Sequence, residues 1–234
     1  MIIFNGKLSS DYYFVVEHYP IYVKPKKKTS KISIPGKNGD LIIDDGEYEN
    51  SSLPYEIVLD GHIIGFEEAS EKLSQFVYSD GYARLEDSYF TQFYRMAVIS
   101  DEIKITNYKH KMGRATLNFD ALPERWYKSG EKVVSVKNEG TIVNPSVYKA
   151  KPLIKVYGTG PGTIAIGPSS MRVNTLDDFL NIDCETQNVY RNVAEFRNSY
   201  VERSDFIEIG PGESKVTFDG GISKVEIIPR WWTI

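Results

Sequence analysis

The sequence predicts a mostly β fold in two domains. The first is an α+β domain, sandwich-like, with one helix and a projecting β-hairpin arm, and the second is an all-β sandwich. Three observations predict this fold class. Short runs with a period of two recur along the chain, one segment alone has helical periodicity, and sixteen Tyr and eleven Phe favour pleated, half-buried surfaces.

The clearest strand is Arg114–Asp120, where Ala115, Leu117 and Phe119 alternate with polar residues. This alternation buries one face of the strand and leaves the other face in water. Similar runs occur at Tyr12–Val16, Pro54–Leu59, Phe93–Ile99, Leu153–Tyr157, Lys215–Phe218 and Ser223–Ile228. Their regular spacing is typical of a sandwich or barrel.

One segment, Phe66–Tyr78, has the spacing of an amphipathic helix. Its apolar residues recur three and four positions apart, and Glu67 and Glu68 fall in the first turn, where acidic side chains suit the helix dipole. Asp80-Gly81 ends the helix. The first domain is therefore expected to be strands with one covering helix.

The composition changes between Pro123 and Asn144, where a polar, turn-rich stretch is typical of a linker. We therefore assign residues 1–128 to the first domain and 129–234 to the second. The glycine-rich stretch Gly158–Gly162 is not followed by a helix, which a phosphate-binding loop needs, so a tight hairpin turn is expected there.

Charge and cysteine content exclude several classes of protein. A net charge of −4 gives no reason to expect nucleic acid as a partner. Cys184 is the one cysteine, which excludes an internal disulfide and fits a reducing compartment. The N-terminal segment lacks the pattern of a secretory signal, and no window has the length of apolar sequence that a membrane span needs. We expect synthesis and folding in the cytoplasm.

No pattern in the sequence points to an enzyme. The histidines, His18, His62 and His110, are far apart along the chain, and no zinc-protease, paired-cysteine or serine-nucleophile motif occurs. The acidic stretch Asp44–Glu49 lacks the ligand register of an EF-hand, so a solvated turn is expected there. We therefore expect no catalytic residue, no metal site and no cofactor.

The stretch Lys24–Asp60 predicts the hairpin arm. Asn38-Gly39 between two apolar runs is a strong hairpin signal, because both turn positions then take positive φ. A basic base and an acidic return strand suit head-to-tail contact between identical subunits, as in a ring. We hypothesise that Lys26, Lys27 and Lys28 of one subunit help to close the ring through Asp44, Asp45 or Glu47 of its neighbour.

This stretch also carries a resemblance. Ile34–Leu41, followed by an acidic Gly-Glu-Tyr, resembles the N-terminal domain of distal tail (Dit) proteins from long-tailed bacteriophages and prophages of Gram-positive bacteria. Further fragments agree in order and spacing along nearly the full chain: Phe4-Asn5-Gly6, Gly140-Thr141, Asn144-Pro145, Ala150–Gly158, Ile182–Glu185, Gly210-Pro211-Gly212 and Ile228–Trp232.

The resemblance implies a non-enzymatic virion protein that forms a hexameric ring at the tail tip or baseplate and acts in host adsorption. Its first domain builds the ring and its second is a galectin-like sandwich that points outward. The ring joins the tail tube protein to the tail-tip hub and in some phages carries receptor-binding proteins. The arm residues that match the family are Pro35, Gly36, Asn38, Gly39 and Asp40.

The alternative function is binding of bacterial surface saccharides by the second domain. Stacking of a sugar on an exposed aromatic ring, with polar groups beside it, would distinguish this function. Asn192, Glu195, Arg197 and Asn198 are candidates, although a polar loop also explains them. The chain shows no inserted carbohydrate module.

Overall fold

A computed structural model describes residues 1–109, 111–192, 195–202 and 206–234. The chain divides into two compact units, Met1–Arg125 with Ile234, and Trp126–Thr233. The structural division therefore follows Arg125, whereas the sequence places the domain boundary after residue 128. Among the described residues, no helix is long and apolar enough to cross a membrane.

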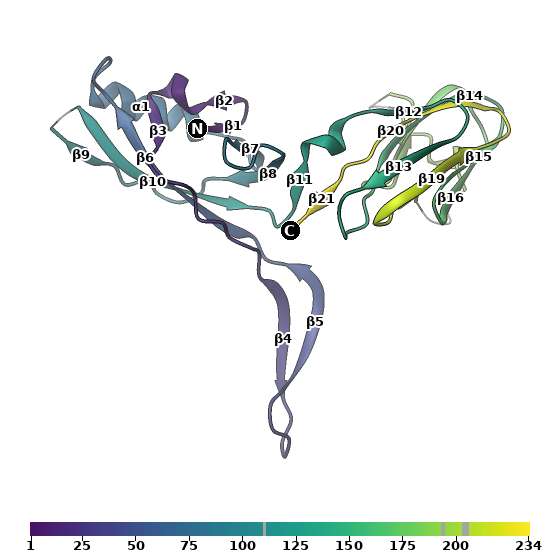
Figure 1. Cartoon of the computed structure of the whole chain (residues 1–234), viewed down its shortest axis with the longest axis horizontal. Coiled ribbons are helices and arrows are strands. Elements are labelled where there is room, and N and C mark those ends of the chain that lie inside the picture. Colours follow the sequence, from purple (N-terminus) through teal and green to yellow (C-terminus); the bar gives the residue numbers. More distant parts are fainter. Residues whose placement is uncertain (110, 193–194, 203–205) are drawn as a thin grey trace. The chain divides into compact units, whose positions relative to one another are not determined.

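The first unit is built on one antiparallel sheet with the strand order β2-β1-β7-β8-β10-β6-β3, and β9 pairs with β10 (Figure 1). Its strands are β1 (Ile2–Phe4), β2 (Lys7–Leu8), β3 (Phe14–Val16), β6 (Ser51–Asp60), β7 (Ala83–Asp87), β8 (Phe93–Val98), β9 (Thr106–Tyr108) and β10 (Met112–Ala121). β6 and β10 pair along their whole length, from Ser51 opposite Ala121 to Asp60 opposite Met112. The alternation predicted for Ala115, Leu117 and Phe119 is confirmed, since all three are buried.

The helix α1 (Phe66–Val77) has Ala69, Leu73 and Phe76 on its buried face. The ring of Phe76 packs edge-on against Phe14, with 4.7 Å between ring centroids. The predicted helix is thus confirmed, with its last residue at Val77. Burial of Ala69, Leu73 and Phe76, which are four and three residues apart, holds the helix on the sheet.

The strand expected over Tyr12–Val16 begins later than its apolar pattern indicates. Ser9–Tyr12 form a 3₁₀ turn, and Tyr13 has a φ of 58°, which extended strand does not permit. β3 therefore covers only Phe14–Val16 and pairs with β6.

The second unit is a sandwich of two antiparallel sheets, β12-β20-β14-β17-β18 and β13-β19-β15-β16. Their strands are β12 (Val134–Val136), β13 (Gly140–Asn144), β14 (Leu153–Thr159), β15 (Gly162–Ile166), β16 (Ser169–Val173), β17 (Asp177–Asp183), β18 (Asn188–Tyr190), β19 (Gly212–Phe218) and β20 (Ile222–Ile228). The short strand β11 (Arg125–Tyr127) pairs with β21 (Trp232–Thr233). One apolar core lies between the two sheets and includes Ile154, Val156, Ile164 and Val216.

The expected hairpin turn at Gly158–Gly162 is wrong. β14 pairs with β17 and β20, whereas β15 pairs with β16 and β19, so the stretch carries the chain from one sheet to the other. The crossing passes very close to Gly221, whose carbonyl oxygen would lie 2.0 Å from a Cβ on Gly158. Glycine is required there because the two backbones touch.

Candidate assembly surface

The arm is a two-stranded sheet of its own, formed by β4 (Lys27–Ser33) and β5 (Asp40–Tyr48) (Figure 1). Every residue of β4 is exposed, and only Tyr48 of β5 is partly covered. The hairpin therefore has almost no support from the core of its unit. An isolated two-stranded hairpin is at best marginally stable in water, so a contact along its length would stabilise this arm.

The arm ends in a loop formed by Ile34–Gly39 rather than a two-residue turn. Gly36 and Gly39 take positive φ, 83° and 84°, whereas Asn38 does not, so the expected positive φ at Asn38 is wrong. Pro35 and Gly36 occupy the centre of a turn in which the amide of Lys37 donates to the carbonyl of Ile34 at 3.1 Å. Proline followed by a left-handed glycine is the sequence of a type II turn.

The acidic stretch expected to be a solvated turn lies mostly inside β5. Thr29 is opposite Asp44 and Lys27 is opposite Tyr48, so β5 carries extra residues between Asp44 and Tyr48 as a bulge. Gly46, with a φ of 76°, supplies the left-handed conformation that such a bulge uses. The bulge explains how a run of acidic residues and one glycine continues a strand.

The basic and acidic residues of the arm pair within one chain. Lys27 contacts Asp44, and Lys28 contacts Glu47 at 2.8 Å, in each case between the ammonium and carboxylate groups. A hydrogen bond from Lys27 lowers the pKa of Asp44, and one from Lys28 lowers the pKa of Glu47. Lys27, Lys28 and Asp44 are about half exposed and Glu47 is 68% exposed, so each side chain can also face a charge on a neighbour.

The remaining arm residues of the hypothesis are also at the surface. Lys26 lies 3.6 Å from Glu49, measured between charged groups. Asp40 begins β5 opposite Ser33, and Asp45 lies within the bulged part of the strand. Whether these residues meet a second subunit stays a prediction.

The arm also has an apolar face, which the sequence analysis missed. Ile32 is directly opposite Leu41, and Ile43 follows on the same face two residues later in β5. Their exposed fractions are 47%, 44% and 42%, respectively. The alternation of Leu41 and Ile43 in the sequence is consistent with this face, but it lies directly before the acidic stretch Asp44–Glu49.

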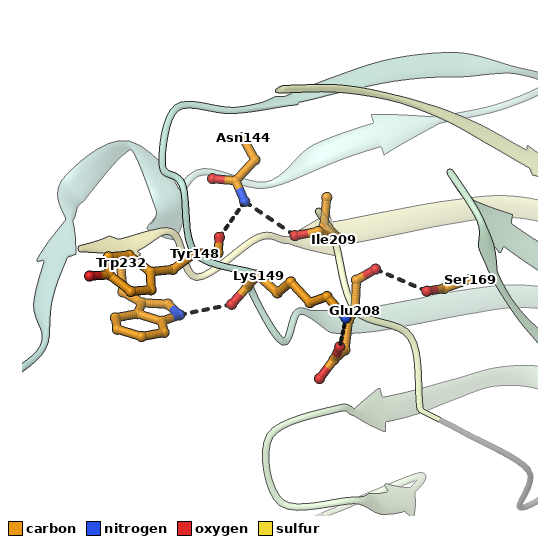
Figure 2. Close-up of polar contacts among 7 residues, drawn as sticks. All are labelled: Asn144, Tyr148, Lys149, Ser169, Glu208, Ile209 and Trp232. Carbon is orange, nitrogen blue, oxygen red and sulfur yellow. Dashed lines mark hydrogen bonds and ion pairs between the residues drawn. The ribbon is translucent and has the colours of Figure 1, made fainter. Parts of the chain in front are cut away.

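In the second unit, Asn144 and Trp232, from two of the family-like fragments, take part in a network of polar contacts (Figure 2). The buried side chain of Asn144 donates to the carbonyls of Tyr148 and Ile209, at 2.8 and 3.1 Å. Trp232 stacks on Tyr148 and donates from Nε1 to the carbonyl of Lys149 at 2.9 Å. These bonds fix the loop between β13 and β14 against the end of the chain.

The Ile182–Glu185 fragment meets the closing Ile228–Trp232 fragment. The guanidinium of Arg230 donates to both carboxylate oxygens of Asp183, at 2.7 and 3.1 Å. Burial alone raises the pKa of Asp183, but the hydrogen bond and charge of Arg230 outweigh it, and the net shift is downward. The bidentate pair therefore joins two segments far apart in the sequence.

The fold of the whole chain is similar to that of a solved structure. SPP1 Dit (gp 19.1), described as a paradigm of the hub adsorption apparatus in phages that infect Gram-positive bacteria, aligns with a TM-score of 0.74. The alignment covers 100% of this chain and 98% of that chain, at 13% sequence identity. The chain has the fold of SPP1 Dit. No protein-family model matches the sequence, and no curated protein sequence does.

The likeness to SPP1 Dit confirms the fold that the resemblance implied: mostly β, with β-sandwich architecture. Sequence identity this low means that the fold is what the two chains share. The galectin-like character of the second unit, the ring and the partners of the assembly stay predictions.

The residues weighed for sugar binding are held in local loop contacts. Arg197 pairs with Glu195, and Asn198 accepts a hydrogen bond from the amide of Val189 at 2.6 Å. The carbonyl of Asn192 accepts from the amide of Glu195. A polar loop accounts for these four residues, and saccharide binding stays untested.

The described histidines each lie beside a carboxylate at the surface. His18 is 3.8 Å from Glu56, and His62 is 2.8 Å from Asp60. His110 lies outside the described residues. Across the described ranges, no three side chains of His, Cys, Asp or Glu gather as a metal site would need.

Proposed function

We propose that this chain is a structural protein of a bacteriophage tail tip, and that it acts as a homo-hexameric ring rather than as an enzyme. Residues 1–128 form the ring, and residues 129–234, a galectin-like sandwich, point outward. The ring joins the tail tube protein to the tail-tip hub and offers a surface for a receptor-binding protein. It needs no cofactor, and it is made in the cytoplasm of the host bacterium.

The observation that carries this proposal is the alignment with SPP1 Dit over the full length of both chains. A match of one unit alone would support a shared module. Here the alignment covers all of this chain, which includes both units and the arm between β3 and β6. Fold by itself does not define function, so the exposed arm supplies the second support.

The arm favours the proposal of an assembly, because its exposed apolar surface is more stable in contact with a second subunit than in contact with water. Its apolar face exposes Ile32, Leu41 and Ile43, whose burial is favourable. We propose that this face packs on the neighbouring subunit of the ring. The rows formed by Lys26, Lys27 and Lys28 and by Asp44, Asp45 and Glu47, at the base of the arm, then align the two subunits.

Static light scattering of the purified chain, over a range of protein and salt concentrations, tests the proposal. The chain has a mass of 26.6 kDa. Six copies give about 160 kDa, the closed cyclic assembly expected here. The measured mass should rise toward that value with protein concentration. A mass that stays at the monomer value under every condition contradicts the proposal.

A further inference from the structure

A small cavity in the first unit brings two arginines together among aromatic rings. Arg95 comes from β8 and Arg125 from the first residue of β11. The cavity has a volume of about 40 Å³. That volume holds roughly three water molecules, or one group of the size of a carboxylate. The other polar side chains on its wall include Asp87, Tyr55 and Tyr22.

Both guanidinium groups are buried without a carboxylate partner. Each arginine is only 7% exposed, and among the described residues neither forms an ion pair. The Nη1 of Arg95 has no hydrogen-bond partner within the described chain, and its Nη2 reaches the carbonyl of Val23 only at 3.4 Å. Arg125 donates to the hydroxyl of Tyr22 and lies over the ring of Phe93. Buried charges are normally paired, so the two guanidinium groups lack the anionic partner that such a site requires.

The carboxylate of Asp87 does not complete it, because other donors already hold its oxygens. One oxygen accepts from the amides of Tyr89 and Phe90, and the other accepts from the hydroxyl of Tyr55 at 3.0 Å. Burial raises the pKa of Tyr55, so that hydroxyl stays protonated and continues to donate. The cavity thus has two positive charges against one negative charge.

The two arginines also act on each other. Burial lowers the pKa of Arg95, and the nearby charge of Arg125 lowers it further. A second anion between the two arginines would offset both the burial of the Arg95 charge and its repulsion by Arg125. A guanidinium presents parallel N–H donors that match the two oxygens of a carboxylate.

We propose that this cavity is a carboxylate-binding site in which Arg95 supplies the free donor and Arg125 the second charge. The excess of one positive charge and the small volume suit a single carboxylate better than a larger or doubly charged anion. The rings of Tyr22 and Phe90 also line the cavity and are 41% and 37% exposed, so they can provide apolar contact for the group that carries the carboxylate.

The carboxylate has two sources, an Asp or Glu side chain of a second copy of this chain or a free small acid. Among the described residues Asp45 has no ion pair, so the arm can present an acidic group to a neighbour. Delivery by a second copy rests on the proposed ring, whereas carboxylate binding itself does not.

The experiment compares the full-length chain with two variants, Arg95→Met, which removes the free donor, and Arg114→Gln. The second is the matched control, since Arg114 is an exposed arginine of the same sheet whose partner is Glu17, away from the cavity. Thermal unfolding is measured in sodium acetate and in sodium chloride at equal ionic strength. Light scattering measures self-association of the same proteins. Arg95→Lys replaces Arg95→Met if that variant does not fold.

A free acid as the ligand is supported if acetate raises the unfolding temperature of the wild type and of Arg114→Gln more than chloride does, and Arg95→Met loses that difference. A side chain of a second copy is supported if Arg95→Met weakens association about tenfold or more while Arg114→Gln leaves it unchanged. The proposal is overturned if acetate acts as chloride does and association is the same in all three proteins. It is also overturned if Arg114→Gln alters the acetate effect or the association as much as Arg95→Met does. A wild-type chain that never associates argues against the ring, and the acetate comparison alone then decides the site.

Discussion

Replacing the apolar face of the arm should prevent assembly without unfolding the chain. The perturbation is the triple variant Ile32→Ser, Leu41→Ser and Ile43→Ser. Full burial of an Ile or Leu side chain contributes about 1.5–3 kcal/mol. These three side chains are 42–47% exposed, so burial on a neighbour adds a little under half of that for each.

The three residues together should therefore contribute about 2–4 kcal/mol to each arm contact, an upper value because ordering the arm opposes it. The contact should weaken roughly 30-fold to several hundred-fold. Sedimentation velocity over a protein concentration series measures this as a shift of the association midpoint. Thermal unfolding should change little, because every residue of β4 and every residue of β5 except Tyr48 is exposed.

The control is Ile42→Ser on the opposite face of the arm, where Ile42 is 61% exposed and lies across from Lys31. It removes an equally apolar side chain from the same strand. Association of the control should match the wild type. The assignment of this face would be refuted if the triple variant associated as strongly as the wild type, or if the control weakened association as much as the triple variant.

Three further predictions concern charges and the buried thiol. Reversing Lys26, Lys27 and Lys28 to Glu should loosen assembly at physiological salt, and adding Asp44→Lys, Asp45→Lys and Glu47→Lys should restore the ion pairs of the arm. Native mass spectrometry should then show that the fully swapped chain associates with itself but not with the wild-type chain. Oligomers that contain both chains at random would show that these charges do not meet across subunits. Asp183→Asn should cost about 2 kcal/mol in denaturant unfolding, because Arg230 loses its charged partner, whereas Lys149→Gln at the exposed pair with Glu208 should cost less than about 0.5 kcal/mol. Because the folded chain lowers the pKa of Asp183, the stabilising effect of its carboxylate is complete above the ordinary pKa of 3.8 and is lost as the pH falls below that value. The stability of Asp183→Asn should therefore fall less steeply in acid than that of the wild type. An equally steep fall in both proteins would contradict this account. Burial raises the pKa of Cys184 to about 12, so a thiol reagent should label it only after unfolding, and rapid labelling of the native chain would contradict its buried position.

The sequence by itself determined the features that depend on neighbouring residues. The alternation through Ala115, Leu117 and Phe119 and the helical spacing from Phe66 were sufficient, because the side chain direction in a strand or helix follows from position alone. Asn38-Gly39 predicted where the arm turns, although the geometry of its tip depends on the positive φ of Gly36 and Gly39. These local signals, with the order of the family-like fragments, gave the fold.

Only the tertiary structure decided which strands pair. Gly158–Gly162 has the composition of any tight turn, and its crossing between sheets depends on the contact with Gly221, far along the chain. Arg95 and Arg125 are likewise unremarkable in the sequence. They become two unpaired charges in one cavity because β8 and β11 bring them together and other donors occupy Asp87. Pairing and burial are properties of long-range contacts, and no local pattern encodes them.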